Sequence, residues 1–320
     1  MKDINKESTI QRPADNFNKL GIIIVLLLFG AIGTYLLVNS HASTPAVSLQ
    51  ATSGNLSGNA TVVNNQGASN GKAVRFGNGS NAQIHWLIAI SAAQNLVNSG
   101  GSTGANFIQS INSSSTYEIE PQNSTSSDPL PNATHVMTFQ SYQDMQTAFA
   151  SSHVPSNVQI ILYDNEAWTG TPAVEQMQPF TYVPQAEQLA HAKGKLFMNS
   201  PAADLTSVLD PSASDNYTGY LQEKLATLSQ YTDIFEIQAQ NEPTVAGFQS
   251  FATQAVAEAR TANPHALVLL GITAKQNGPS PQNLINEVTA TKSITDGYWL
   301  NIPGGDVSVA LPLLAAWPSM

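Results

Sequence analysis

Residues 234–243, with the sequence IFEIQAQNEP, limit the folds open to this chain more than any other stretch. Read as a β-strand, the stretch places its apolar side chains on one face and Glu236, Gln238 and Gln240 on the other. Glu242 continues the polar series if the strand geometry persists. Helical patterns precede and follow the stretch, and such an alternating series usually builds a parallel sheet with both faces covered. Polar side chains inside such a sheet need a polar interior, which the mouth of a closed (β/α)8 barrel provides.

The chain repeats this strand-then-helix rhythm from residue 84 onward, with roughly 30–35 residues per unit. Besides the stretch above, we expect strands at 135–139, 158–163, 195–199, 266–271 and 297–302. We expect helices at 142–150, 184–192, 220–231, 246–262, 281–291 and 307–317. Two further strands are needed from residues 84–133, where the pattern is least clear. The sequence therefore predicts an α/β fold, a (β/α)8 TIM-like barrel over residues 84–320. A doubly wound open sheet is the alternative, but no glycine-rich phosphate fingerprint follows any strand.

Residues 20–38 contain no charged side chain and are flanked by Lys19 and Asn39. At the rise of an α-helix they span roughly 28 Å, close to the hydrocarbon thickness of a bilayer. We therefore expect a single transmembrane anchor, with a basic cytoplasmic tail at residues 1–19 and the bulk of the chain outside the cell membrane. A cleaved signal sequence followed by secretion is the alternative, because residues 40–42 (Ser-His-Ala) form an acceptable cleavage site.

Residues 39–83 form a Gly/Asn/Ser-rich segment between this anchor and the predicted barrel. Short alternating runs between glycine and asparagine turns predict two or three small strands. The runs LSGNATVV at 56–63 and GKAVRFG at 71–77 resemble the opening of β-sandwich carbohydrate-binding modules. The resemblance covers about 35 residues, whereas such a sandwich needs on the order of 100. A β-rich linker is therefore an equally good interpretation, and the resemblance transfers no sugar-binding residues.

The composition excludes several classes of function. Charged residues make up 11% of the chain, and 12 Lys and Arg against 22 Asp and Glu give a net charge of -10. Nucleic-acid binding is therefore disfavoured. The lack of cysteine excludes thiol catalysis, disulfides and cysteine-ligated zinc. His85, His135, His153 and His265 show no spacing typical of metal ligands, so we expect no metal site and no cofactor.

Three predicted strand ends carry polar or aromatic residues, and in βα barrels the catalytic groups lie at these ends. After the strand at 158–163, Asp164 and Glu166 share one parity, so both carboxyl groups are expected to face the mouth. Carboxylates and amides bind sugar hydroxyls, and aromatic rings cover the apolar face of a sugar ring. The predicted substrate-binding residues are Trp168, Asn199, Gln238, Gln240, Asn241, Trp299 and Asn301.

Two short motifs resemble those of known glycoside hydrolases. Residues 241–243 (Asn-Glu-Pro) are similar to the motif of the large retaining β-glycosidase clan, in which the Glu is the general acid/base. Residues 164–166 (Asp-Asn-Glu), followed by Trp168, resemble the end of the chitinase-type D-x-x-D-x-D-x-E motif, in which the Glu is the acid. The chain thus looks like a bacterial extracytoplasmic TIM-barrel protein of the glycoside-hydrolase type. Leu162 stands where the chitinase-type motif has an aspartate, and residues 297–302 lack the nucleophile glutamate of the clan.

Glycoside hydrolysis requires two carboxyl groups. We expect Glu166 to be the acid or the nucleophile, with Asp164 tuning its pKa by like-charge repulsion. The partner is Glu242 or Glu236, and for Glu236 a structural role, bonded to Gln238 and to neighbouring strands, is the preferred interpretation. The resemblance implies action on the O-glycosidic bonds of a polysaccharide or cell-wall glycan. Because the motif for the second carboxylate is missing, a non-catalytic glycan-binding or cell-envelope scaffold protein of the same fold is the alternative.

Overall fold

The chain divides into two compact units, Met1–Gly77 and Asn78–Met320. In the first unit, β1 (Ala60–Asn64) and β2 (Lys72–Phe76) form an antiparallel pair. The predicted anchor at 20–38 lies outside the described residues, and within the described part of the chain no helix is long and apolar enough to cross a membrane. The structure is a computed structural model, and it describes residues 60–64, 72–76, 84–120 and 128–319.

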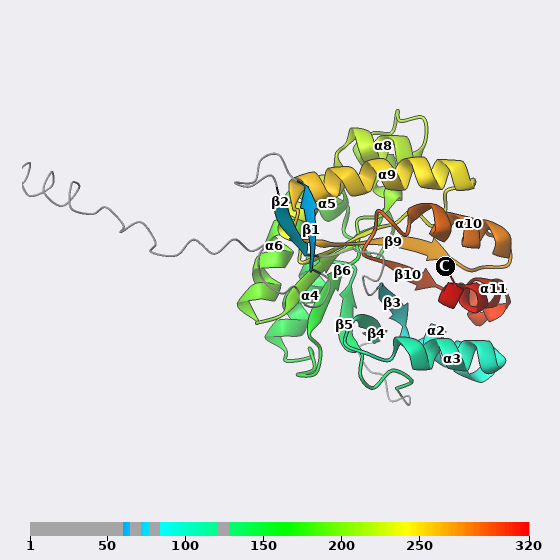
Figure 1. Ribbon diagram of the computed structural model, residues 1–320. Coiled ribbons are helices and arrows are strands. Elements are labelled where there is room, and N and C mark those ends of the chain that lie inside the picture. The colour runs from blue at the N-terminus through cyan, green and yellow to red at the C-terminus, as the bar shows by residue number, and fades with distance from the viewer. Residues whose placement is uncertain (1–59, 65–71, 77–83, 121–127, 320) are drawn as a thin grey trace, which may run out of the picture. The chain divides into compact units, whose positions relative to one another are not determined.

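Eight parallel strands close into a barrel in the second unit (Figure 1). The strands are β3 (His85–Ala89), β4 (Thr116–Glu120), β5 (Thr134–Phe139), β6 (Ile160–Tyr163), β7 (Leu196–Asn199), β8 (Ile234–Ile237), β9 (Leu267–Thr273) and β10 (Gly297–Asn301). Each strand pairs with the next one along the chain, and β10 pairs with β3 to close the barrel. The predicted barrel is confirmed, and the two strands that the sequence leaves hidden within 84–133 are β3 and β4.

Helices lie around the barrel and connect its strands (Figure 1). The α-helices are α2 (Ile90–Ser99), α3 (Gly101–Ile111), α4 (Tyr142–Ala150), α5 (Ala173–Met177), α6 (Pro179–Ala192), α7 (Thr206–Leu209), α8 (Asn216–Gln222), α9 (Val245–Ala262), α10 (Pro281–Thr291) and α11 (Leu311–Ala316). The hydroxyls of Ser141, Thr244 and Ser280 cap α4, α9 and α10, because each accepts a hydrogen bond from the N–H three residues later. Helices α4 and α10 have the bounds that the sequence predicts.

Two apolar layers stabilise the barrel, and the alternation of side chains along each strand produces both. The inner layer, inside the barrel, contains the buried side chains Leu87, Tyr117, Val136, Ile160, Leu162, Met198, Ile234 and Leu269. Residues of the opposite parity, such as Tyr163 and Phe235, pack in the outer layer against the helices. On β10, Trp299 packs against the inner layer, whereas Tyr298 and Leu300 belong to the outer one.

Strand β8 ends earlier than the sequence predicts. The backbone turns at Ala239, whose N–H donates to the carbonyl of Ile237, and the N–H of Glu242 donates to the carbonyl of Ala239. Gln238 directs its amide to the barrel interior, where it bonds Asp164. Glu242 lies in the turn, so the strand geometry does not persist to this residue and Glu242 does not continue the polar series of the strand.

The predicted helix at 220–231 is divided in two. Helix α8 ends at Gln222, and a 3₁₀ helix (Leu225–Tyr231) follows it. Between them Lys224 has a φ of +58°, in the left-handed region that residues with a side chain rarely adopt. This single backbone conformation interrupts the α-helix.

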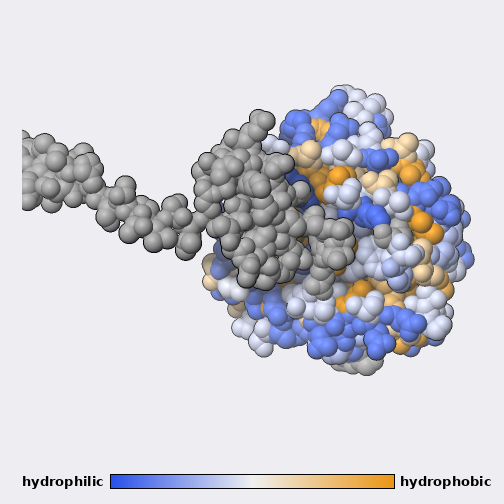
Figure 2. All heavy atoms as spheres, viewed as in Figure 1, coloured by the Kyte–Doolittle hydropathy of each residue, from blue (hydrophilic) through white to orange (hydrophobic). Residues whose placement is uncertain are grey.

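Hydrophilic residues cover most of the coloured surface in Figure 2, and hydrophobic residues form small, separate patches. Four of the exposed large hydrophobic side chains follow β6 within a short stretch: Trp168, Val174, Met177 and Phe180. This stretch begins at the carboxyl end of β6, so the chain carries these exposed apolar side chains as it leaves the mouth of the barrel.

Candidate functional site

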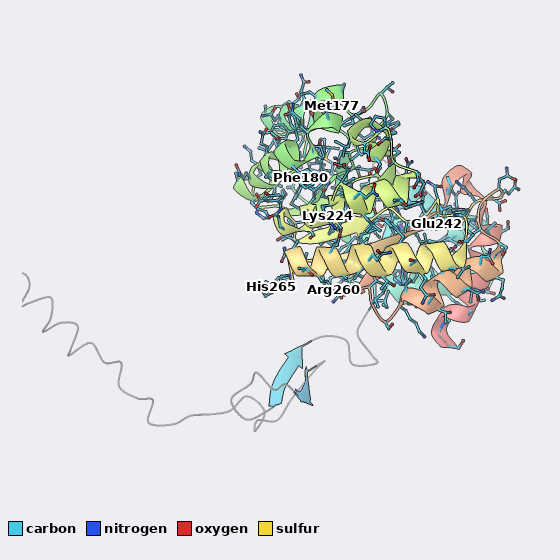
Figure 3. The ribbon with its side chains drawn as sticks, turned by 90° about the horizontal axis from the view of Figure 1, so that it is seen from above. Met177, Phe180, Lys224, Glu242, Arg260 and His265 are labelled. Atoms are coloured by element: carbon cyan, nitrogen blue, oxygen red, sulfur yellow. The ribbon has the colours of Figure 1, made fainter. Side chains whose placement is uncertain are left out.

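The carboxyl ends of all eight strands form one end of the barrel. Figure 3 shows Glu242 at the end where α9 begins, and Arg260 and His265 at the end where α9 finishes. Because α9 runs back along the barrel from the end of β8, Glu242 marks the mouth. The polar residues that the sequence places after β6, β7 and β8 meet at this mouth.

Asp164, Ser200 and Glu236 lie at one level of the barrel, because their strands pair in register just before them. The Ser200 hydroxyl donates to Oε2 of Glu236. Nε2 of Gln238 donates to Oδ1 of Asp164 at 2.9 Å and to the Ser200 hydroxyl at 3.1 Å. Ser200 and Gln238 therefore link the two buried carboxyl groups. Glu236 is bonded from the neighbouring strand β7, through Ser200, as expected, whereas Gln238 bonds Asp164 and not Glu236.

Gly271 of β9 makes room for these side chains inside the barrel. A Cβ atom at this position would lie 2.5 Å from Oε1 of Glu236 and 2.2 Å from Oε1 of Gln240, well inside van der Waals contact. A glycine here therefore lets both side chains approach the backbone of the neighbouring strand. Oε1 of Glu236 accepts no hydrogen bond from the described residues.

Burial shifts the acid–base behaviour of this group. Burial, and then the charge of Glu166, raises the pKa of Asp164 to about 8. Burial raises the pKa of Glu236 far above its ordinary value, although the hydrogen bond from Ser200 opposes the shift. Burial, and then the charge of Asp204, raises the pKa of Glu166. Asp164 and Glu236 therefore carry protons at neutral pH, because an ionised carboxylate is poorly solvated in this interior.

A cavity of about 930 Å³ opens at the mouth. Its polar lining includes Glu166, Asp204, Gln238, Gln240, Asn241 and Glu242. Asp164 and Glu236 are buried and do not line it. The N–H of Ala167 donates to Oδ1 of Asp204 at 3.0 Å, which fixes the loop that carries Glu166. Glu166 is thus the member of the buried acid group that reaches the open space.

The other predicted binding residues occupy different places. Asn301 lines the cavity. Asn199 is wholly buried and donates to the carbonyl of Tyr163 at 2.8 Å, so it lies outside the cavity and the prediction that it contacts substrate directly is wrong. Trp299 packs against the inner apolar layer and also lies outside the cavity. Trp168 is 43% exposed but is not part of the cavity wall.

Besides Asp204, the mouth contains Ser200, Tyr217 and Lys275, and none of these was among the predicted site residues. Ser200 follows β7 with the inward parity of Met198, so strand alternation carries a signal for it. The hydroxyl of Tyr217 accepts a hydrogen bond from the N–H of Asn241 at 3.0 Å. Nζ of Lys275 donates to Oδ1 of Asn241 at 3.0 Å. Tyr217 and Lys275 come from a helix and from a loop, and no local pattern in the sequence marks them.

The mouth offers carboxyl, amide and hydroxyl groups around an open cavity, which suits a ligand with many hydroxyl groups. Its carboxyl groups with raised pKa values suit proton transfer near neutral pH. Among the described residues, the three side chains close enough to share one metal ion lie elsewhere, on β4, on β5 and just before β5.

No protein family model and no curated protein sequence matches the chain. Among solved structures, a chitinase from Chromobacterium violaceum is similar at 12% identity and a TM-score of 0.46, covering 74% of this chain and 100% of that chain. The spore cortex-lytic enzyme SleL from Bacillus megaterium is similar at 10% identity and a TM-score of 0.44, with 76% of each chain covered.

The carboxyl transferase domain of pyruvate carboxylase from Rhizobium etli is similar at 8% identity and a TM-score of 0.43, covering 70% of this chain and 40% of that chain. Because one barrel architecture serves unrelated chemistries, the likeness carries no conclusion about activity, and the function has to be argued from the residues of the mouth.

Proposed function

We propose that the barrel acts on polysaccharide as a glycoside hydrolase, with Glu166 as its general acid. The observation that carries this proposal is the position of Glu166, whose carboxyl group lines the mouth cavity while burial and the charge of Asp204 raise its pKa. A raised pKa keeps a proton available near neutral pH, as protonation of a glycosidic oxygen requires. Asp164 and Glu236 are themselves protonated and add no charge beside Glu166, so burial and Asp204 raise its pKa in place of the like-charge repulsion expected from Asp164.

Glu242 is the proposed second carboxyl group. It lines the same cavity, and its Oε1 accepts long hydrogen bonds from the N–H and the hydroxyl of Thr244, at 3.4 and 3.3 Å. As Glu166 protonates the leaving oxygen, Glu242 activates a water molecule or attacks the sugar carbon. Asp204 also lines the cavity, but Oδ1 of its carboxylate is already bonded to the N–H of Ala167, so it is the weaker candidate.

The neutral side chains of the cavity bind the sugar. Gln240, Asn241 and Asn301 supply amides that donate to and accept from hydroxyl groups. Tyr217 adds a hydroxyl and an aromatic ring to the same wall. We assign Trp168, exposed beside the mouth, to a further sugar unit outside the cavity.

The test is the release of reducing ends from a panel of soluble and insoluble polysaccharides. We expect Glu166→Gln and Glu242→Gln each to lower turnover by about 10²–10⁴-fold, because general acid–base catalysis contributes that much. Both variants keep the melting temperature of the parent, since the two side chains are not fully buried. Glu187→Gln on α6 is the matched control, since it removes a carboxyl group that pairs with His191 outside the cavity.

Undiminished turnover in both cavity variants contradicts the proposal. Saturable glycan binding without any release of reducing ends replaces it with a glycan-binding function for the same mouth. If Asp204→Asn lowers turnover and Glu242→Gln does not, Asp204 is the second carboxyl group. That result overturns the assignment of Glu242 and leaves the role of Glu166 unchanged.

We also propose that the barrel lies outside the cell membrane. The support is the uncharged run at 20–38 behind a basic stretch at 1–19. Protease added to intact cells is then expected to degrade the barrel while a cytoplasmic marker survives. Protection of the barrel until the cells are lysed contradicts this location.

A further inference from the structure

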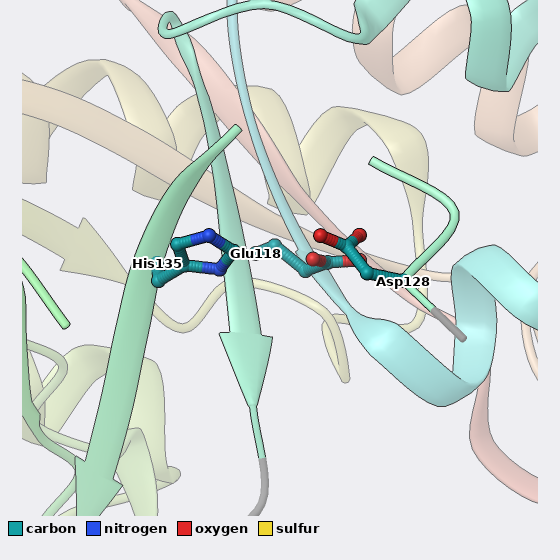
Figure 4. Close-up of side chains that lie close together, drawn as sticks. All are labelled: Glu118, Asp128 and His135. Atoms are coloured by element: carbon teal, nitrogen blue, oxygen red, sulfur yellow. The ribbon is translucent and has the colours of Figure 1, made fainter. Parts of the chain in front are cut away.

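Strands β4 and β5 place charged side chains on the outer face of the barrel. Tyr117 and Ile119 of β4 pack with the inner apolar layer, so Glu118 between them faces outward. In the parallel pairing, Glu118 lies opposite His135 of β5. Figure 4 shows these two side chains together with Asp128, which comes from the segment leading into β5. The strand register thus brings Glu118 beside His135, and Asp128 joins them from the segment before β5.

These three side chains are close enough to share one ion. One ligand atom from each of Glu118, Asp128 and His135 lies within 4.8 Å of the others. The Glu118 side chain is wholly buried, whereas Asp128 and His135 are half-buried. Neither carboxylate oxygen of Glu118 accepts a hydrogen bond from the described residues. A buried carboxyl group without a donor is costly, so this arrangement needs a further partner.

The neighbours of Glu118 indicate what that partner is. The carboxyl group of Asp128 lies beside that of Glu118, since ligand oxygens of the two lie within 4.8 Å of each other. Two carboxyl groups that face each other repel unless a proton or a cation lies between them. Nδ1 of His135 lies 2.5 Å from Oε1 of Glu120, so a further carboxylate lies beside the imidazole ring. A carboxylate outside the metal shell commonly orients a metal-binding histidine.

We propose that Glu118, Asp128 and His135 bind a divalent cation of the zinc or manganese type. Carboxylate oxygens suit manganese, and carboxylates combined with imidazole suit zinc, whereas calcium prefers six to eight oxygen ligands. The cation neutralises the facing carboxylates and ties the segment at Asp128 to the barrel wall. Glu118 and His135 face outward from the barrel, so the site is structural and separate from the chemistry of the mouth.

The test is cation binding by the full-length protein after removal of bound metal with a chelator. Zinc chloride and manganese chloride are titrated separately by calorimetry, and thermal unfolding is followed with and without each cation. We expect one cation per chain, and a melting temperature raised by about 5–10 °C at a cation concentration of about 100 times Kd. Glu118→Gln and His135→Asn are each expected to weaken binding by at least about tenfold and to abolish the thermal shift.

His191→Asn is the matched control, because His191 also lies between two carboxylates, those of Glu187 and Asp233, on another part of the surface. This variant keeps the binding and the thermal shift of the parent. Glu118→Gln conserves the volume of the buried side chain. If this variant nevertheless folds poorly, His135→Asn tests cation binding at a half-buried position of the same site.

Three results overturn the proposal: no saturable binding by the parent, equal binding by Glu118→Gln, or an equal loss in His191→Asn. Suppose that the parent shows no saturable binding and that the metal-free Glu118→Gln variant is more stable than the parent at high pH. The two carboxyl groups then share a proton, and no cation lies between them. None of these measurements uses glycan turnover, so their results are independent of the proposed function.

Discussion

Buried carboxyl groups lie on both faces of the barrel wall, and the two faces differ in what surrounds them. Inside, Glu236 accepts a hydrogen bond from Ser200, and Asp164 accepts one from Gln238. Outside, Glu118 has no donor among the described residues and faces a second carboxyl group. Burial raises the pKa of all three acids. The inner acids thus have neutral donors in addition to nearby carboxyl groups, whereas the only close partners of Glu118 among the described residues are the side chains of its own cluster.

This difference teaches what a buried carboxyl group requires from its neighbours. A hydroxyl or an amide donates to the acid without adding charge, so the inner group is stable with the groups that the protein itself supplies. A second carboxyl group adds negative charge, so the outer group needs a shared proton or a cation. The inner arrangement suits proton transfer, and the outer one suits cation binding.

The largest expected effect on stability is a pH dependence from the inner acids. The folded pKa of Asp164, about 8, lies above its ordinary value of 3.8, so between these pH values the folded state holds a proton that the unfolded state has lost. The contribution is fully present at low pH and is lost as pH rises toward 8, by up to about 1.4 kcal/mol per pH unit. Asp164→Asn is expected to flatten the fall in unfolding free energy over this range, measured by urea denaturation from pH 4 to 8.

Asp215→Asn is the control for this experiment, because its shift has the opposite sign. The N–H and hydroxyl groups of Thr218 lower the pKa of Asp215, so its contribution is complete above its ordinary pKa and is lost only as pH falls below it. This variant keeps the slope of the parent between pH 4 and 8. If the pH dependence of the unfolding free energy is unchanged in Asp164→Asn, Asp164 is ionised in the folded state. That result contradicts the account of the inner acids.

A smaller effect is expected when the inner acid is deprived of its neutral donor. Ser200→Ala removes the hydroxyl that donates to Glu236 and accepts from Gln238, which brings the inner group closer to the state of Glu118. We expect a loss of about 1–3 kcal/mol in unfolding free energy, the cost of a buried polar group without its partner. Ser207→Ala removes an exposed hydroxyl that bonds the carbonyl of Asp204, and it serves as the control. Equal costs for the two serines contradict a special role for the inner bond.

The features that the sequence predicts correctly each depend on a short stretch of chain. The helix at 142–150 follows from the cap at Ser141 and from Met145 and Ala148, which are buried at helical spacing. The inward direction of Asp164 and Gln238 follows from strand alternation, and the closed barrel then brings them within 2.9 Å.

The features that sequence analysis misses depend on backbone turns and on strand register. The turn at Ala239 takes Glu242 out of the strand parity. Asn199 shares the outward parity of Tyr163, with which β7 pairs it, so its polar character alone was misleading. The pairing of Glu118 with His135 arises from the register of β4 against β5, and the spacing of histidines along the chain does not reveal it.

The most direct test of the account is glycan turnover measured in metal-free and in zinc- or manganese-loaded protein, for the parent and for Glu166→Gln. We predict that, at a temperature where both forms are folded, the parent releases reducing ends at the same rate with and without the cation. Glu166→Gln is predicted to lose that activity in both forms. Full activity in Glu166→Gln, or activity in the parent that disappears with the metal while the fold persists, would contradict the assignment of the chemistry to the carboxyl groups of the mouth cavity.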